Sequence, residues 1–351
     1  MERKKIKLQT LTPVHIGNGE ILKENFDYIN TKDKNGIYIT PINHNKLFKC
    51  LNEKGQNVIL QYTSMLQSGG GIKSFIDKLP DNEKESCYNR YIWLDTEQKN
   101  LAQELREQIY DGFGKPYIPG SSIKGAIRTV IISDLMQNLR ELNLKYNAVL
   151  GNITQYLQVS DVMFENGCTD ALNMINLNIR KSYRDESKRQ LVEAITKGEE
   201  SYLTIKITNT QKFQVASSIK DLFCRINKHT QRILNNEIKF WNEDEYIENG
   251  GLIVENYIDT CKELRKDITA LDNNSCILRL GHANGWKFIT GDWVKAKATN
   301  NEEWHNIVNR SRPNNERNYS QYPFPKTRRI NITDDKVNLL GFVKLTIENN
   351  K

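Results

Sequence analysis

Paired cysteines are missing from this sequence. Its 351 residues include six cysteines, and no two of them are spaced as a C-x-x-C pair. This spacing fits neither a zinc ribbon nor a disulfide framework. We therefore expect no metal and no cofactor, and reduced, mostly structural thiols at Cys50, Cys87, Cys168, Cys224, Cys261 and Cys276.

Long apolar runs are missing too. The sequence contains no stretch of about 18 apolar residues, the length needed to cross a membrane, and the opening Met1–Lys5 lacks the apolar core of a signal peptide. We therefore expect a cytoplasmic protein. An apolar share of 38% and a charged share of 26% fit a globular chain, and this length usually makes two domains. The net charge of +7 allows an acidic partner without requiring one.

A nucleotide-binding phosphate loop is also missing. That motif needs Gly-x-x-x-x-Gly-Lys followed by Ser or Thr. Here Gly120 and Gly125 have the right separation, but Ala126 and Ile127 follow them. An anion held by this segment is therefore expected to be a backbone phosphate of nucleic acid rather than a nucleoside triphosphate.

The surrounding segment, Lys115–Arg128, is the most informative in the chain. A Pro-Gly turn precedes two candidate N-cap serines and an apolar stripe at helical spacing, with two cations lying away from the stripe. Cations are unfavourable at the positive end of a helix unless an anion lies nearby. The pattern predicts a phosphate-binding helix start, and the alternative is an ordinary capped helix with solvated cations. The predicted binding residues are Gly120, Ser121, Ser122, Lys124, Gly125 and Arg128.

Hydrophobic periodicity predicts an α+β fold in two regions. Residues 1–210 carry several alternating strands around the predicted helix, which fits a ferredoxin-like split βαβ domain with a mostly helical insertion at about 43–110. The clearest strand is Tyr202–Ile207. Residues 211–351 form a C-terminal α+β half, largely helical from about 212 to 270 and closing with strands at 276–280 and 339–347.

Four segments resemble one family. Thr10–Gly19 resembles the opening signature of the repeat-associated mysterious protein (RAMP) superfamily of CRISPR systems, and Tyr117–Arg128 is similar to its central Pro-Gly-Ser-Ser-x-Lys-Gly motif. Val159–Asp161 and Leu280–Trp286 resemble a third landmark and the C-terminal glycine-rich loop. The order of these segments, the insertion and the total length are most similar to the family that forms the fifth subunit of type III-A Csm interference complexes.

The resemblance implies a modified RNA-recognition fold and a non-catalytic role. Members of that family cap one end of a filament of backbone RAMP subunits, contact the 3′ part of the guide RNA (crRNA), and support its maturation while target RNA pairs with the guide. They bind RNA mainly through loops and glycine-rich backbone. This agrees with the absence here of the Arg/Lys-Gly-Phe-x-Phe motif of standard single-stranded RNA readers.

The N-terminal loop offers the next candidates. Glycine permits close approach, so His15, Gly17, Asn18 and Gly19 can present backbone amides to a phosphate; the alternative is a tight turn after a strand. His15 is also the candidate general base of a rival hypothesis, an RNA endonuclease that processes the guide precursor without a metal. A metal-assisted version would use carboxylates such as Asp27, Asp33 and Asp161, although Asp33 fits a simple turn better.

Two basic clusters complete the set. Arg180, Lys181 and Arg184 lie where this fold extends a thumb-like hairpin, with Tyr183 as a residue that can stack on a base; Lys326, Arg328 and Arg329 follow Pro323 and Pro325. Solvated loops are the alternative for both clusters. In the C-terminal loop, Gly281 and Gly285 are expected to approach RNA while Trp286 and Trp293 pack in the core.

We therefore predict a guide-RNA-binding scaffold subunit without catalytic residues. Its partners would be crRNA, target RNA and backbone subunits. The endonuclease is the rival hypothesis, and a platform that recruits host ribonucleases is a third.

Overall fold

A computed structural model gives the fold. It describes residues 1–94, 101–138, 155–209, 215–291, 300, 302–303, 306 and 325–348. Leu139, at the end of the predicted stripe, and Trp293 lie outside the described residues. Within them, no helix is both long and apolar enough to span a membrane.

The first sheet has five strands in the order β13–β16–β1–β12–β8, and every neighbouring pair is antiparallel. Following the chain through β1, α5, β8, β12, α7 and β16 gives the β-α-β-β-α-β pattern of a ferredoxin-like fold, which confirms the predicted fold class. The bounds are β1 (Glu2–Thr10), α5 (Gly120–Asn138), β8 (Leu157–Val159), β12 (Glu200–Ile207), α7 (Ile219–Trp241), β13 (Ser275–Arg279) and β16 (Phe342–Ile347).

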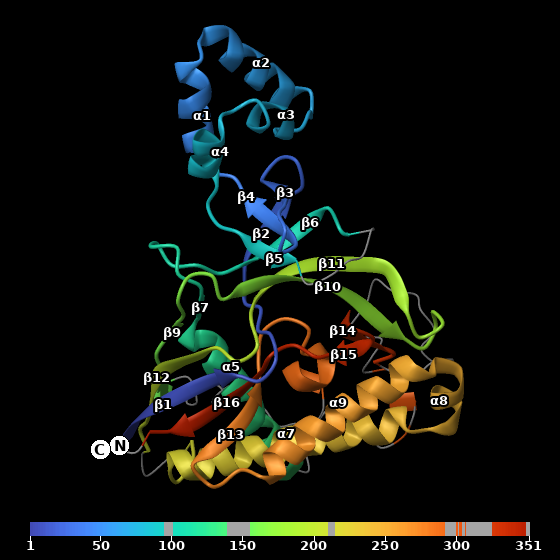
Figure 1. Cartoon of the computed structure of the whole chain (residues 1–351). Coiled ribbons are helices and arrows are strands. Elements are labelled where there is room, and N and C mark those ends of the chain that lie inside the picture. Colours follow the sequence, from blue (N-terminus) through green and yellow to red (C-terminus); the bar gives the residue numbers. More distant parts are fainter. Residues whose placement is uncertain are drawn as a thin grey trace.

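Alternation along β1 explains how this sheet is packed. Ile6 and Leu8 are fully buried, and they join a core that includes Ile123 and Ile127 of α5 and Leu222 of α7. Side chains alternate between the two faces of a strand, so the residues between them point to the other face. Strand β16 from the end of the chain lies beside β1, and both termini lie at this end of the molecule (Figure 1). The predicted regions 1–210 and 211–351 therefore share one sheet.

A second, larger sheet runs β2–β6–β11–β10–β5–β4–β3, with β14 and β15 attached beside β10. Its longest strands, β10 and β11, form a hairpin that arches across the molecule above α7 and α9 (Figure 1). The bounds are β2 (Gly17–Lys23), β3 (Tyr28–Lys32), β4 (Ile37–Pro41), β5 (Ile92–Leu94), β6 (Glu104–Gln108), β10 (Thr169–Asn178), β11 (Asp185–Ile195), β14 (Thr327–Thr333) and β15 (Lys336–Asn338). Two short strands, β7 (Tyr117–Ile118) and β9 (Val162–Met163), pair separately.

Four helices form a lobe that projects from the second sheet (Figure 1). They are α1 (His44–Glu53), α2 (Gln56–Gln67), α3 (Lys73–Ile76) and α4 (Asp81–Cys87), with their own small core of residues such as Leu47, Leu51 and Ile76. The helical insertion predicted at about 43–110 was too long, because the chain returns to the second sheet at β5 and β6. The sequence after Cys87 is polar and irregular, so hydrophobic periodicity does not predict these short strands.

The C-terminal helices pack on a second core around a buried charge cluster. Besides α7 these are α8 (Asp244–Gly250), α9 (Leu252–Thr269) and a π-helical turn, Lys287–Gly291. Glu237 of α7 accepts from Arg328 Nε at 2.5 Å, from Lys287 Nζ at 2.6 Å and from Tyr257 Oη at 2.7 Å. Burial alone would raise the pKa of Glu237, but Arg328 and Lys287 hold it well below its usual range.

This cluster corrects the prediction of a phosphate contact at Arg328. The side chain is only 10% exposed and its guanidinium is committed to Glu237. A phosphate would have to displace that carboxylate to bind here.

We expect Arg328→Ala to lower the free energy of unfolding by about 3–5 kcal/mol, because it removes one partner of a buried ion pair. Arg225→Ala is the matched control on α7. It breaks a partly exposed ion pair in which Arg225 Nη2 and Asp221 Oδ2 are 3.2 Å apart, and it should lower the free energy of unfolding by less than about 1 kcal/mol. Urea denaturation of both variants measures the difference. Equal losses would show that the Glu237 cluster contributes no more than a surface pair.

Candidate nucleic-acid interface

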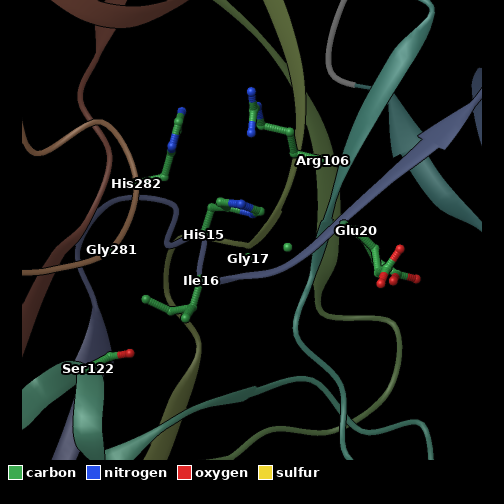
Figure 2. A pocket seen from close by; sticks show the side chains of 10 residues that line it. His15, Ile16, Gly17, Glu20, Arg106, Ser122, Gly281 and His282 are labelled. Carbon is green, nitrogen blue, oxygen red and sulfur yellow. The ribbon is translucent and has the colours of Figure 1, made fainter.

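Three of the segments singled out in the sequence meet at one open pocket of about 450 Å³. The N-terminal loop, the start of α5 and the C-terminal glycine-rich loop all contribute to it, together with β6. In Figure 2, His282 and Arg106 lie on either side of His15, and Ser122 lies below them. The lining residues are His15, Ile16, Gly17, Gly19, Glu20, Arg106, Glu107, Ser122, Gly281 and His282.

A buried carboxylate, Glu193 of β11, fixes one wall of the pocket. It is fully buried and accepts from Arg90 Nε at 3.0 Å, Arg90 Nη2 at 2.8 Å, Tyr110 Oη at 2.5 Å and Thr169 Oγ1 at 3.1 Å. The main-chain carbonyl of Glu193 accepts from His15 Nδ1 at 2.6 Å. Because a carbonyl only accepts, His15 carries its proton on Nδ1 when neutral, and Nε2 keeps its lone pair.

The C-terminal loop is fastened to the N-terminal loop by main-chain contacts. His282 N donates to His15 O at 2.9 Å, and the segment just before β16 adds a second link, because Gly341 N donates to Pro13 O at 2.8 Å. Gly281 has φ +80°, and a Cβ at this position would lie 2.4 Å from His15 O. Gly281 lines the pocket, but glycine is needed at this position because the backbone of His15 lies so close. Gly285 has φ +72° and open space around it.

The start of α5 differs from the prediction. The helix begins at Gly120, so neither Ser121 nor Ser122 is its N-cap. The carboxylate of Asp161 accepts from Gly120 N at 2.7 Å, which places a protein anion where part of the predicted phosphate seat was expected. Ser122 lines the pocket, whereas Lys124 and Arg128 lie further along the helix and are half-buried. Arg128 Nε finds no hydrogen-bond partner in the described part of the chain.

Positive charges converge around the pocket and act on one another. Burial, and then the charges of His15, Arg329 and Arg106, lower the pKa of His282 to about 4. Burial also lowers the pKa of His15, against the hydrogen bond to Glu193 O, and Arg106 lowers it further. The pKa of Arg329 is lowered by burial and next by Arg106. Arg106 thus makes a positive charge on each of these three neighbours less favourable, and a bound anion would lower that cost.

A second hollow continues from the pocket along β6. It measures about 360 Å³ and is lined by residues that include Arg106, Gln103, Arg189 and Gln190. Arg106 lines both hollows, so the two lie next to each other at this residue; we refer to the pair as the track along β6.

The tip of the β10–β11 hairpin presents three predicted cations. Arg180, Lys181 and Arg184 are exposed there, although Arg184 pairs with Glu186 at 2.8 Å. Tyr183 is buried against Trp241 and Tyr246, so the prediction that it stacks on a base is wrong. Its backbone has φ +62°, and this turn conformation directs the ring inward.

The other predicted residues are scattered. Asn18 Nδ2 donates to Glu107 Oε2 at 2.6 Å, and the exposed Gly19 lines the pocket. Lys326 directly precedes β14, and Arg329 lies within that strand, where its Nη1 donates to Lys188 O at 2.6 Å. The candidate carboxylates do not form one site. Asp27 and Asp33 accept main-chain N–H groups of two different turns, and Asp161 caps α5.

Sequence reasoning missed Glu193, Arg90 and Arg106. A signal existed for Glu193, because a single carboxylate inside the apolar run Leu191–Ile195 needs a buried partner. No comparable signal distinguishes Arg106 within the charged stretch Glu104–Gln108.

Comparison with known families matches residues 7–286 to the RAMP superfamily. The chain belongs to this superfamily. Within it, the chain is similar to proteins described as CRISPR system Cms protein Csm5. The protein from Streptococcus thermophilus is 34% identical over 142 residues, 37% of this chain and 38% of that protein. The one from Enterococcus italicus is 28% identical over 148 residues, 36% of this chain and 42% of that protein. These alignments therefore span about two fifths of the relatives' length.

Solved structures share the fold over nearly the whole chain. A chain of a cryo-EM structure of a Csm–crRNA–target RNA ternary complex from a type III-A system matches with TM-score 0.69 and 15% identity, covering 99% of this chain and 100% of that one. The crystal structure of T. onnurineus Csm5 matches with TM-score 0.61 and 16% identity, covering 96% and 99%. The fold class and the family resemblance inferred from the four segments are thus confirmed.

We expect Gly120→Ala to destabilise the protein, because a Cβ there would lie 2.2 Å from Val159 O. That contact is with main chain, so relief requires a shift of α5 away from β8, and a loss of about 1–3 kcal/mol is expected. Gly125→Ala is the control on the same helix; it meets nothing within 4 Å and should add about 0.5–1 kcal/mol of stability. Thermal melting of both variants measures this. A stabilising Gly120→Ala would contradict the close packing.

Proposed function

We propose that this protein is a guide-RNA-binding subunit of a type III-A CRISPR interference complex. It caps one end of the backbone filament, contacts the 3′ part of the crRNA, and supports crRNA maturation without cutting RNA itself. The observation that carries the proposal is the pocket where His15, Ser122 and His282 meet beside Arg106. Three segments far apart in the sequence contribute to it, and each of them could contact the same anion bound in the pocket.

The electrostatics of the pocket support a phosphate ligand. After burial, the charge of Arg106 lowers the pKa values of His15, His282 and Arg329, so a bound phosphate would offset the repulsion between Arg106 and Arg329 as well as add attraction. The track along β6 suits a polymer, and the exposed cations at the hairpin tip can extend the contact with its backbone. The fold match to a chain from a complex with crRNA and target RNA supports the same ligand and partners.

A second candidate function, RNA cleavage without a metal, has one observation in its favour. Such cleavage needs a base, an acid and a cation, and His15, His282 and Arg106 line the same pocket. The protonation states of the two histidines argue against it. Both histidines have lowered pKa values, His282 at about 4, so neither is protonated near neutral pH to act as the acid. Recruitment of host ribonucleases remains a third proposal, with no surface assigned to it.

We expect Arg106→Glu to weaken binding of crRNA in the reconstituted complex by about tenfold or more and to flatten its salt dependence. Losing one phosphate contact on single-stranded RNA should reduce the slope of log affinity against log salt by about 0.7. Lys46→Glu on the exposed face of α1 carries the same change of charge and should have little effect. Filter binding across a salt titration measures both.

The contrary outcomes are distinct. Equal affinity of the two variants would contradict phosphate binding in the pocket. Specific cleavage of the guide precursor in EDTA, abolished by His15→Ala, would replace the scaffold proposal with the endonuclease.

Capping follows from how filaments grow. Head-to-tail contacts continue until one face is missing, so a cap has one docking face and one blocked face. We place the block in the C-terminal half, where α7, α8 and α9 pack outside the first sheet (Figure 1).

The isolated protein should therefore be monomeric, and the complex should contain one copy of it. Light scattering after size-exclusion chromatography, with and without RNA, measures the first, and native mass spectrometry of the complex measures the second. RNA-dependent homopolymers of the isolated chain would assign it a backbone role instead.

A further inference from the structure

The face of the first sheet opposite the helices carries a row of cations. Because Ile6 and Leu8 of β1 point into the core, Arg3, Lys5 and Lys7 point to the other face. On the neighbouring strand β12, Leu203, Ile205 and Ile207 are buried, so Tyr202, Thr204 and Lys206 share that face. We refer to this surface as the open face.

The strand register places these side chains in rows. Arg3 lies opposite Lys206, Lys5 opposite Thr204, and Lys7 opposite Tyr202. A hollow of about 380 Å³ lies over them, lined by residues that include Arg3, Lys5, Tyr202 and, from the end of β8, Ser160. It shares no lining residue with the pocket around His15.

Tyr202 is the aromatic at the centre of this surface. Its side chain is 48% exposed, which is unusual for a large ring in the middle of a sheet. Lys5 Nζ lies 4.1 Å from the ring centroid, so a cation–π contact on one side helps fix the ring against the sheet. An exposed ring that is already oriented loses little entropy when a base stacks on it.

Two carboxylates lie along the open face, Glu200 beside Lys7 and Glu348, whose main-chain N–H donates to Lys5 O. Glu200 pairs with Lys7 at 2.7 Å, and this hydrogen bond, with a further contribution from Glu348, raises the pKa of Lys7. At the other end, the carboxylate of Glu2 accepts from Ile219 N at the start of α7. The cations of β1 and β12 on this face, Arg3, Lys5, Lys7 and Lys206, outnumber Glu200 and Glu348, so positive charge remains in excess around Tyr202.

We propose that the open face is a second binding site for single-stranded RNA, with one base stacked on Tyr202 and backbone phosphates bound by Arg3 and Lys206. It deepens the proposed function by adding a contact outside the loops. Aromatics and cations together on a sheet are how single-stranded RNA is held without strong sequence preference. An acidic protein surface would match the charge but would not need an exposed, oriented ring.

The test uses the isolated full-length chain and a 5′-fluorescein oligouridylate of about 12 nucleotides, within the usual site sizes. Tyr202→Ala should weaken binding, measured by anisotropy, about tenfold, whereas Tyr202→Phe should stay within about twofold because the ring remains. The double reversal Arg3→Glu and Lys206→Glu should weaken binding further and reduce the salt slope by about 1.4, at about 0.7 per phosphate.

The control is Lys46→Glu with Lys49→Glu, the same charge change on exposed residues of the distant α1 lobe (Figure 1). Thermal melting accompanies each variant, and Tyr202→Leu, which keeps apolar area without a ring, should behave like Tyr202→Ala. Wild-type affinity in a folded Tyr202→Ala, or no binding of the oligonucleotide by the wild type, would overturn the inference.

Arg106→Glu in the same assay separates this inference from the proposed function. Weakening by Arg106→Glu alone leaves the pocket as the RNA site and refutes the open face. Weakening by Tyr202→Ala alone does the reverse. Open-face variants that bind oligouridylate normally but fail to join reconstituted backbone subunits would assign the surface to a protein partner and refute RNA binding there.

Discussion

The pocket depends on one buried ion pair, Glu193 with Arg90. A carboxylate at zero exposure costs several kcal/mol unless its oxygens are satisfied. Here Arg90, Tyr110, Thr169 and the main-chain N–H of Gln108 satisfy them together. Arg90 comes from the chain after α4, and the other donors come from or next to β6 and β10, the strands on either side of β11, so Glu193 links these segments. His15 bonds the carbonyl of the same residue, and the C-terminal loop then bonds His15. Movement of Glu193 would therefore displace every loop of the pocket.

Several carboxylates are bound by amide and hydroxyl donors instead of by cations, which explains why a chain of modest net charge has concentrated positive surfaces. Asp161 is bound by the amide of Gly120, and Glu193 takes hydroxyl and amide donors besides its single arginine. Glu107 is drawn to Arg90 and Asn18 rather than to Arg106. Asp161, Glu193 and Glu107 thus bind scaffold groups, whereas Glu20 is the carboxylate in the lining for which no such bond is described. Arg106 lines the pocket, and after burial its charge is the next cause of the lowered pKa of Arg329.

Local patterns in the sequence predicted what depends on neighbours along the chain. Alternation located Tyr202–Ile207 within β12, and the Pro-Gly-Ser-Ser segment located the start of α5 to within a residue or two. Contacts between residues far apart in the sequence could not be predicted from local patterns. Arg328 looked like a surface cation because Glu237 lies 91 residues away, and Arg90 meets Glu193 across 103 residues. The open face was missed for another reason. Tyr202 and Lys206 lie on β12 but Arg3 and Lys5 lie on β1, about 200 residues earlier, so no contiguous motif brings them together.

Two RNA surfaces on one chain would suit the end of a filament. An internal subunit shares its RNA with a neighbour on each side, whereas a terminal subunit has one neighbour, so its own contacts must hold the strand's end. Linking two weak sites through one RNA makes the second binding event intramolecular, and the combined affinity then exceeds either alone by far more than their sum. Each site can stay weak enough to release RNA during trimming while the pair retains it. In the proposed arrangement, the loops would supply phosphate contacts at fixed positions, and the open face would supply stacking that tolerates any base.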